Sequence, residues 1–431
     1  MMPARGSVTR RGLLALVGTS AMAGCSGLGG LAGRRRETIR AYDLPDIDED
    51  SALDPPVQPS VPVEIEASHL DTARTRTTSL LARLPLPLGP DDIPNGHVRR
   101  ELTDAADDAT DRLDEALEAD TRFAALRALR HARDQARSAA AGWAVVEDGL
   151  TVERVRREHR QSVADARSFR EDHEYLGRDP VRAALVHARI ETALERAVDD
   201  TRVHPSHEGS DLLAVAAWGE EAESVRALVA DVRQLDAQFT ASLPNDVGTV
   251  GATIRGAAER LLSDIRSRRP DLPPEPTAEE WGVEERLVVD LRRAASRGPK
   301  RIAEALGPAT AVVDANRRLA YIRALQRVHS RLDEDGGYQI ESAADIRSLR
   351  TEAYDALQTA LEASPVPDLA RTVVTDAGGR IASADWELSR IQGEARLSQF
   401  DDVVGGYLAG RALARATPEA CRQTVDTLGT G

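Results

Sequence analysis

The sequence VRALVADVRQLDAQF, residues 225–239, shows most clearly how this chain folds. Its apolar residues recur at steps of three and four, the spacing that places side chains on one face of an α-helix. Residues 247–265, 312–332 and 346–361 repeat this pattern. From about residue 68 onward, the periodicity predicts about ten to twelve helices. The chain is therefore expected to be all-α, either a multi-helix bundle or an irregular array of long antiparallel helices.

Residues that begin and end helices support this prediction. The expected start signals are Asp179-Pro180, Thr277 with Glu280, Ser342 with Asp345, and Thr417-Pro418. Ser364-Pro365 is an expected stop. Val61, Val63 and Ile65 alternate with other residues, so the fold class allows at most one short N-terminal strand there.

The first 25 residues have three successive parts. Arg5, Arg10 and Arg11 are positively charged, residues 12–24 are apolar or small, and Cys25 follows. An apolar run of 13 residues is too short for a membrane span, which needs roughly 20 residues, but it suits the apolar region of a signal peptide. We predict that residues 1–24 are an export signal.

Two motifs in this segment carry a family resemblance. Arg10-Arg11-Gly12-Leu13-Leu14 resembles a twin-arginine export signal, and Met22-Ala23-Gly24-Cys25 resembles the lipobox of secreted lipoproteins. The resemblance implies that Cys25 is lipidated, and that the protein is anchored to the outer face of the cell membrane through this lipid. The alternative is a cleaved signal followed by an incidental cysteine.

The composition is acidic and almost without lysine. Removal of residues 1–24 takes away three arginines and no acidic residue, which changes the formal net charge from −15 to −18. This charge argues against a nucleic-acid partner. Abundant acids, a single lysine (Lys300) and few aromatic residues are similar to proteins of extreme halophiles. Together with the signal, they resemble exported lipoproteins of halophilic archaea.

The expected domains follow from these patterns. Residues 25–60 combine glycine, acidic residues and proline, which predicts a disordered tether behind the lipidated cysteine. Two helical domains are expected at residues 61–268 and 277–431, separated by a proline-rich stretch, although they are also compatible with a single packed body. Only one other cysteine exists, Cys421, and it is expected to be a buried, unreactive side chain.

One cluster has the chemistry of a metal site. His204, His207 and Glu208 lie within five residues and could bind zinc if His173 or His187 supplied another ligand. The alternative is a polar loop that caps the next helix. Acids beside imidazoles at Glu158-His159 and at residues 171–174 could do acid–base work, or could lie on a solvated helix face. No nucleophile elbow, zinc-protease motif or phosphate-binding loop is present in the predicted mature chain, so no cofactor and no catalytic residue is predicted.

These observations favour a structural role over catalysis. The leading hypothesis is a lipid-anchored extracytoplasmic scaffold or protein-interaction module with an unidentified protein partner. The alternative is a surface component that binds a solute or a metal and works with a membrane transporter. A helical hydrolase stays open as a third hypothesis, because catalytic residues can be distant in sequence.

Overall fold

The computed structural model describes residues 38–48, 52, 56–199, 210–277, 281–296, 307–335, 338 and 340–429. The chain from Thr38 onward forms one compact unit. Its described residues contain twelve α-helices and one sheet of two short strands, which confirms the all-α fold class. In this part of the chain, no helix combines the length and the apolar character needed to cross a membrane.

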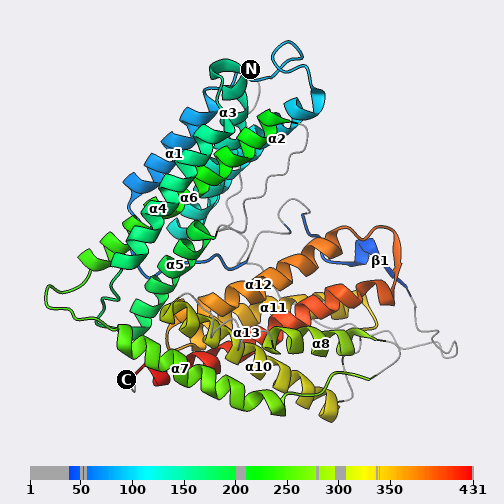
Figure 1. The fold of residues 1–431 in the computed structure, drawn as a ribbon. Coiled ribbons are helices and arrows are strands. Elements are labelled where there is room, and N and C mark those ends of the chain that lie inside the picture. The colour runs from blue at the N-terminus through cyan, green and yellow to red at the C-terminus, as the bar shows by residue number, and fades with distance from the viewer. Residues whose placement is uncertain are drawn as a thin grey trace, which may run out of the picture. The chain divides into compact units, whose positions relative to one another are not determined.

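Six helices come from the first half of the chain (Figure 1). They are α1 (Ala67–Leu81), α2 (Gly96–Glu118), α3 (Arg122–Asp148), α4 (Val152–Asp172), α5 (Pro180–Val198) and α6 (Asp211–Ala241). The α3 helix packs against α1, α2 and α6, and α6 packs also against α4 and α5. A Cβ atom added at Gly219 of α6 would lie 2.5 Å from the Cβ of Ala141 on α3. Small residues therefore set the close approach of these two central helices.

The other six helices come from the second half (Figure 1). They are α7 (Gly251–Arg268), α8 (Val283–Ser296), α10 (Pro308–Asp335), α11 (Ala343–Ala363), α12 (Pro367–Ser389) and α13 (Asp401–Gly429). The α13 helix contacts α8, α10, α11 and α12, while α10 contacts α7, α8 and also α5 of the first half. Gly406 lets α13 lie close to α12, because a Cβ there would meet Ala384 at 2.9 Å.

The apolar stripes lie where their spacing predicts. All six apolar residues that recur within residues 225–239 are buried on α6. Asp179 caps α5 through the amides of Val181 and Arg182, and Ser342 with Asp345 forms a capping box on α11. The α11 helix ends at Ala363, directly before Ser364-Pro365. Buried Cys421 is also confirmed, since its side chain is fully covered.

The helix start predicted at Thr417-Pro418 is wrong. Pro418 lies inside α13, which runs without a break from Asp401 to Gly429. The hydroxyl of Thr417 donates to the carbonyl of Leu413 at 2.8 Å, within the same helix. A proline in a helix interior removes one backbone hydrogen bond. Packing of α13 against six other helices outweighs this local cost.

The N-terminal segment also differs from its prediction. Residues 61–65 form no strand; the short strands are β1 (Thr38–Arg40) and β2 (Glu394–Arg396), which pair antiparallel with Ile39 opposite Ala395. Ile39 and Val57 are buried against the helices, so these parts of the expected tether pack on the body. The reason is apolar burial, which outweighs the polar and proline-rich composition around them.

Residues 57–65, here called the strap, are held by side chains from several helices. Thr121 donates to the carbonyl of Pro59 at 2.7 Å, and Arg182 donates to that of Pro62 at 3.0 Å. Further carbonyls accept from Arg122, Arg189 and Arg371. These donors give the strap carbonyls hydrogen-bond partners although the strap belongs to no sheet.

Candidate functional site

The residues predicted for lipidation, export and metal binding fall outside the described part of the chain. Cys25, Arg10 and Arg11 precede Thr38, and His204, His207 and Glu208 lie between residues 199 and 210. Among the described residues, no group of three or more histidine, cysteine, aspartate or glutamate side chains is arranged to hold a metal ion.

The two histidines considered as additional ligands lie together. His173 Nε2 lies 3.1 Å from His187 Nδ1, and His187 Nε2 lies 2.8 Å from the carbonyl oxygen of Leu176. On the other side of the ring, His173 Nδ1 lies 3.5 Å from the Oδ1 atom of Asp236. Donation to the Leu176 carbonyl requires a proton on Nε2 of His187, so neutral His187 accepts from His173. Both rings are thus engaged in one hydrogen-bonded chain.

Burial controls the charge of this chain. Burial, and then the neighbouring His187, lower the pKa of His173 to about 4. Burial also lowers the pKa of His187, against the opposing effect of its bond to the Leu176 carbonyl. The pKa of Asp236 is raised by burial. Both histidines are therefore neutral near pH 7, and they form part of the core beside Phe239.

A buried carboxylate joins this region to the second half. Glu191 of α5 accepts from the backbone amides of Ala309 at 3.1 Å and Thr310 at 2.6 Å, in the first turn of α10. The hydroxyl of Tyr175 donates to the same carboxylate at 2.7 Å. A negative charge at a helix N-terminus satisfies amides that lack partners within the helix. This interaction fixes the contact between α5 and α10.

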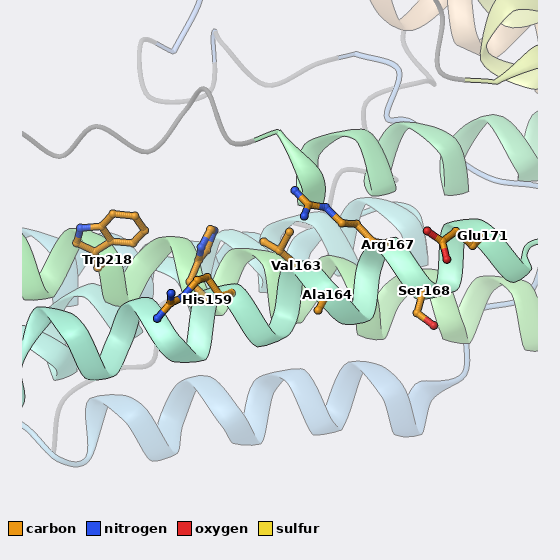
Figure 2. Close-up of a pocket in the computed structure, with 8 residues that line it drawn as sticks. His159, Val163, Ala164, Arg167, Ser168, Glu171 and Trp218 are labelled. Carbon is orange, nitrogen blue, oxygen red and sulfur yellow. The ribbon is translucent and has the colours of Figure 1, made fainter.

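A cavity of about 670 Å³ runs along α4 (Figure 2). It is lined mostly by one face of that helix, from His159 to Glu171, with Trp218 of α6 at one end. His159 meets Trp218 edge to face at 5.5 Å between ring centroids, and Arg156 stacks over the same indole at 4.7 Å. The polar groups follow the helix axis and do not converge, so this groove lacks the arrangement of a specific site.

The acids considered for acid–base chemistry have separate surroundings. Glu158 pairs with Arg137 at 3.1 Å, while His159 faces Trp218. His173 belongs to the histidine chain described above. The contacts given for Glu158 and His159 thus lead to different neighbours, Arg137 and Trp218.

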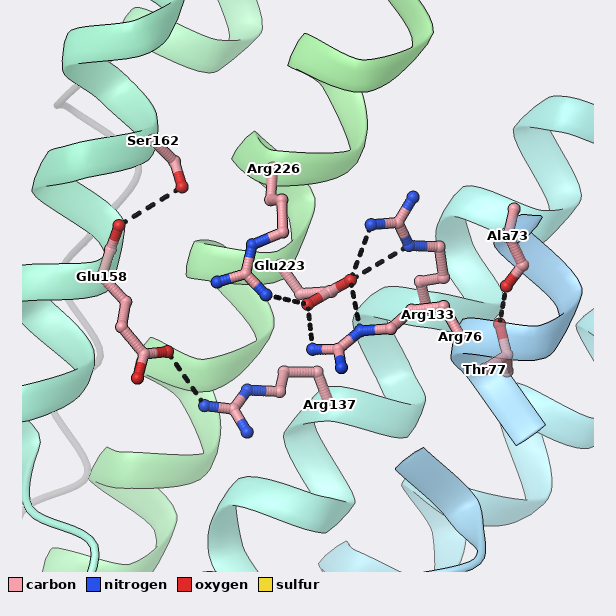
Figure 3. A network of polar contacts seen from close by, with 9 residues as sticks. All are labelled: Ala73, Arg76, Thr77, Arg133, Arg137, Glu158, Ser162, Glu223 and Arg226. Carbon is pink, nitrogen blue, oxygen red and sulfur yellow. Dashed lines mark hydrogen bonds and ion pairs between the residues drawn. The ribbon is translucent and has the colours of Figure 1, made fainter. Parts of the chain in front are cut away.

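The Glu223 hub, made of Arg76, Arg133, Glu223 and Arg226, connects α1, α3 and α6 (Figure 3). Arg133 donates twice to Oε1 of Glu223, at 3.0 and 2.7 Å, and Arg76 donates to both oxygens at 3.2 and 2.9 Å. Arg226 adds a bond of 3.1 Å. Burial would raise the pKa of Glu223, but the guanidinium groups outweigh it and lower the pKa to about 2. This carboxylate is saturated and serves structure.

A second hub lies in the other half of the chain. Asp385 of α12 accepts two bonds of 2.8 Å from Arg350, and also accepts from the hydroxyls of Tyr354 at 2.6 Å and Tyr407 at 2.5 Å. Burial, and then bonds and charge from Asp385, raise the pKa of both tyrosines. The Asp385 hub joins α11, α12 and α13 through their buried faces.

Sequence reasoning missed a cavity of about 300 Å³ that we call the arginine cavity. It is lined by α3, α5 and α6 of the first half, by α10 and α12 of the second half, and by Pro59 of the strap. Its charged lining residues are Arg127, Arg130, Arg189, Arg196, Arg317, Asp231 and Asp376. Five arginines face two aspartates in a chain with a net charge of −15. The local excess of positive charge is opposite in sign to the net charge of the chain, and for this reason the arginine cavity is the candidate functional site.

A signal for this site exists in the sequence. Arg127, Arg130, Arg133 and Arg137 follow at steps of three and four, which places them along one face of α3. Arg182, Arg189 and Arg196 recur at steps of seven on α5. An arginine stripe on a helix that also packs into the core indicates buried anionic partners or an anionic ligand.

Two family models match the chain, and both describe domains of unknown function. DUF8262 matches residues 68–246, and DUF8264 matches residues 251–426. No significant match to a curated protein or to a solved structure was found. The two matches meet between α6 and α7, whereas the sequence placed a boundary at residues 268–277. The arginine cavity is lined by residues from both matched regions.

Proposed function

We propose that this protein is a lipid-anchored helical scaffold or protein-interaction module on the outer face of the cell membrane. The observation that carries the proposal is the order of the arginine pair, the apolar run and Cys25 in the first 25 residues. Two lipid chains on one cysteine give stable anchoring, whereas a single chain gives marginal binding.

The body of the protein suits a scaffold. The Glu223 and Asp385 hubs each tie three helices through saturated buried carboxylates, and Glu191 ties α5 to α10. Such networks hold helices in one arrangement. The solvent face of α2 carries a run of exposed acidic residues, among them Asp104, Asp107, Asp108 and Asp111. This face supports the proposal of a polar surface presented to a partner in concentrated salt.

Cell fractionation tests the anchor. The wild type is expected in the membrane fraction, and added protease should degrade it on intact cells. The Cys25→Ser variant should appear in the medium, and the Arg10→Lys/Arg11→Lys variant should stay inside the cell. Cys421→Ala is the matched control, because it removes the only other cysteine and should leave the protein on the membrane. Retention of Cys25→Ser on the membrane contradicts the lipid anchor.

Crosslinking on intact cells in high salt, followed by mass spectrometry, tests the scaffold role. The proposal expects the same protein partner to be recovered in replicate experiments, through crosslinks to defined helix faces. A variant in which the four acidic residues of α2 named above become asparagine or glutamine should lose those crosslinks that involve α2. Recovery of no protein partner contradicts the interaction role.

The second candidate function is a surface component that binds a solute or metal for a membrane transporter. The arginine cavity favours binding of a solute, because it is a space between helices that five arginines and two aspartates line. The metal form depends on His204, His207 and Glu208. Zinc titration by calorimetry should give heat with the wild type and less heat with His207→Ala. No heat with either protein removes the metal site.

A further inference from the structure

The arginine cavity is a space between helices with an apolar floor. Phe123 and Leu126 of α3 and Leu228 and Leu235 of α6 supply the apolar surface. Its volume of about 300 Å³ is roughly ten times the volume of a water molecule in the liquid. A phosphate or a small organic acid fits such a space together with a few water molecules.

The acids of the cavity are already paired. Asp231 accepts from Arg130 at 3.3 Å and lies 3.0 Å from Nε2 of His69. Asp376 lies 2.7 Å from Nε of Arg317. Arg127 and Arg189 are in no ion pair with any residue that the structure describes. The positive charge in excess therefore resides largely on these two arginines.

Arg189 occupies the most constrained position. Its guanidinium stacks over Phe123 at 5.0 Å, and its only hydrogen bond to a described residue is one of 3.4 Å to the carbonyl of Ser60 in the strap. Burial, followed by the charges of Arg317, Arg127 and Arg196, lowers its pKa to about 10. Like charges held together in a partly buried space cost free energy that an anion would offset.

The hydrogen bonds of the neutral polar groups in the lining indicate which chemical groups a ligand of the cavity needs. The hydroxyl of Thr192 donates to the carbonyl of Ala188, that of Thr372 to Leu369, and that of Thr375 to Arg371. These hydroxyl hydrogens therefore bond to carbonyls of their own helices and are not available to a ligand. The guanidinium groups remain as donors toward the cavity, so a ligand there has to accept hydrogen bonds and carry negative charge.

We propose that the arginine cavity binds a small oxyanion, in the form of a phosphate, sulfate or carboxylate compound, with Arg189 and Arg127 as its principal donors. A planar guanidinium can donate two parallel hydrogen bonds to such a group. The site draws on α3 and α5 from the first half and on Arg317 of α10 from the second half. Binding is therefore expected to strengthen the contact between the two matched regions.

Isothermal titration calorimetry on the intact protein, at a fixed molar concentration of potassium chloride, tests the site. Inorganic phosphate, sulfate and succinate are titrated separately, and the anion that gives saturable heat identifies the chemistry. Arg189→Gln should raise the dissociation constant at least about tenfold, because it removes charge-assisted hydrogen bonds to the anion. Arg127→Gln should also weaken binding, and its exposed position makes it a variant that is expected to fold normally.

Arg390→Gln is the matched control. Arg390 stacks over Trp386 at 4.6 Å, as Arg189 stacks over Phe123, but it lies outside the cavity. Circular dichroism verifies that each variant is folded. The proposal expects unchanged affinity in Arg390→Gln. It is overturned if none of the three anions binds the wild type, or if folded Arg189→Gln and Arg127→Gln bind as tightly as the control.

Discussion

Arginine side chains converge at the Glu223 hub and at the arginine cavity, and the balance of charge differs between these two places. At the Glu223 hub, three guanidinium groups surround one buried carboxylate and use both of its oxygens. At the arginine cavity, five arginines face two aspartates that are already paired. The first arrangement is closed and stabilises the fold. The second is open, and two of its arginines, Arg127 and Arg189, are in no ion pair with a described residue.

The largest effect should come from breaking the closed arrangement. Glu223→Gln leaves Arg133 buried beside a neutral side chain, and loss of one partner from a buried ion pair costs about 3–5 kcal/mol. Chemical unfolding at fixed salt measures this cost. Glu394→Gln, which breaks the exposed pair with Arg40, should change stability far less, because solvent screens exposed ion pairs. Equal losses in the two variants would contradict a structural role for the hub.

Lowering the pH should reduce the contributions of the Glu223 hub and of the histidine chain to stability, each over its own pH range. The pKa values of His173 and Glu223 are lowered to about 4 and about 2 in the folded protein, against about 6.5 and 4.3 in unfolded chains. At a pH between the two pKa values of a group, the unfolded chain binds more protons than the folded protein. Each group therefore stabilises the fold fully above its unfolded pKa, and this contribution is lost as the pH falls toward its folded pKa. Each step is worth about 3 kcal/mol, between about pH 6.5 and 4 for His173 and between about pH 4.3 and 2 for Glu223.

Urea unfolding at a series of pH values measures both steps. His173→Gln should flatten the upper step, and Glu223→Gln should flatten the lower one. A pH profile of either variant that is parallel to that of the wild type rules out the corresponding assignment.

Glycine substitutions should change stability by a smaller amount, and they test the helix packing around the Glu223 hub. Gly219→Ala places a methyl group 2.5 Å from the Cβ of Ala141, and such overpacking costs about 1–3 kcal/mol. Gly405→Ala on α13 meets no atom within 4 Å, so it should stabilise by about 0.5–1 kcal/mol through helix propensity. Thermal unfolding of both variants compares them. If Gly405→Ala also destabilised the protein, the distance to neighbouring atoms would not explain the effect of adding a methyl group at these glycines.

The helices could be predicted from the sequence because their signals are local. The stripe in residues 225–239 and the caps at Asp179 and Ser342 depend on residues within a few positions of one another. Thr417-Pro418 has the same local appearance as a helix start, yet α13 continues through it. Contacts of α13 with distant helices decide that position, and they leave no trace in the adjacent residues.

The candidate site could be predicted only in part, because its residues come from five helices. The arginine stripes on α3 and α5 are visible in the sequence, but their partners are not. Arg76 and Glu223 are 147 residues apart, and Arg133 and Glu223 are 90 apart. Spacing therefore shows that arginines share a face. It does not show which of them meets a carboxylate and which meets a cavity.

The most direct test of this distinction compares Arg133→Gln with Arg189→Gln. Unfolding free energies are measured with and without the oxyanion that calorimetry selects. Without it, Arg133→Gln should lose about 2–3 kcal/mol of stability, because charged hydrogen bonds to buried Glu223 are removed. Arg189→Gln should lose less than about 1 kcal/mol. The oxyanion should then stabilise the wild type and Arg133→Gln equally, and should stabilise Arg189→Gln less. Equal losses in the two variants, or equal stabilisation of Arg189→Gln by the oxyanion, would contradict the account.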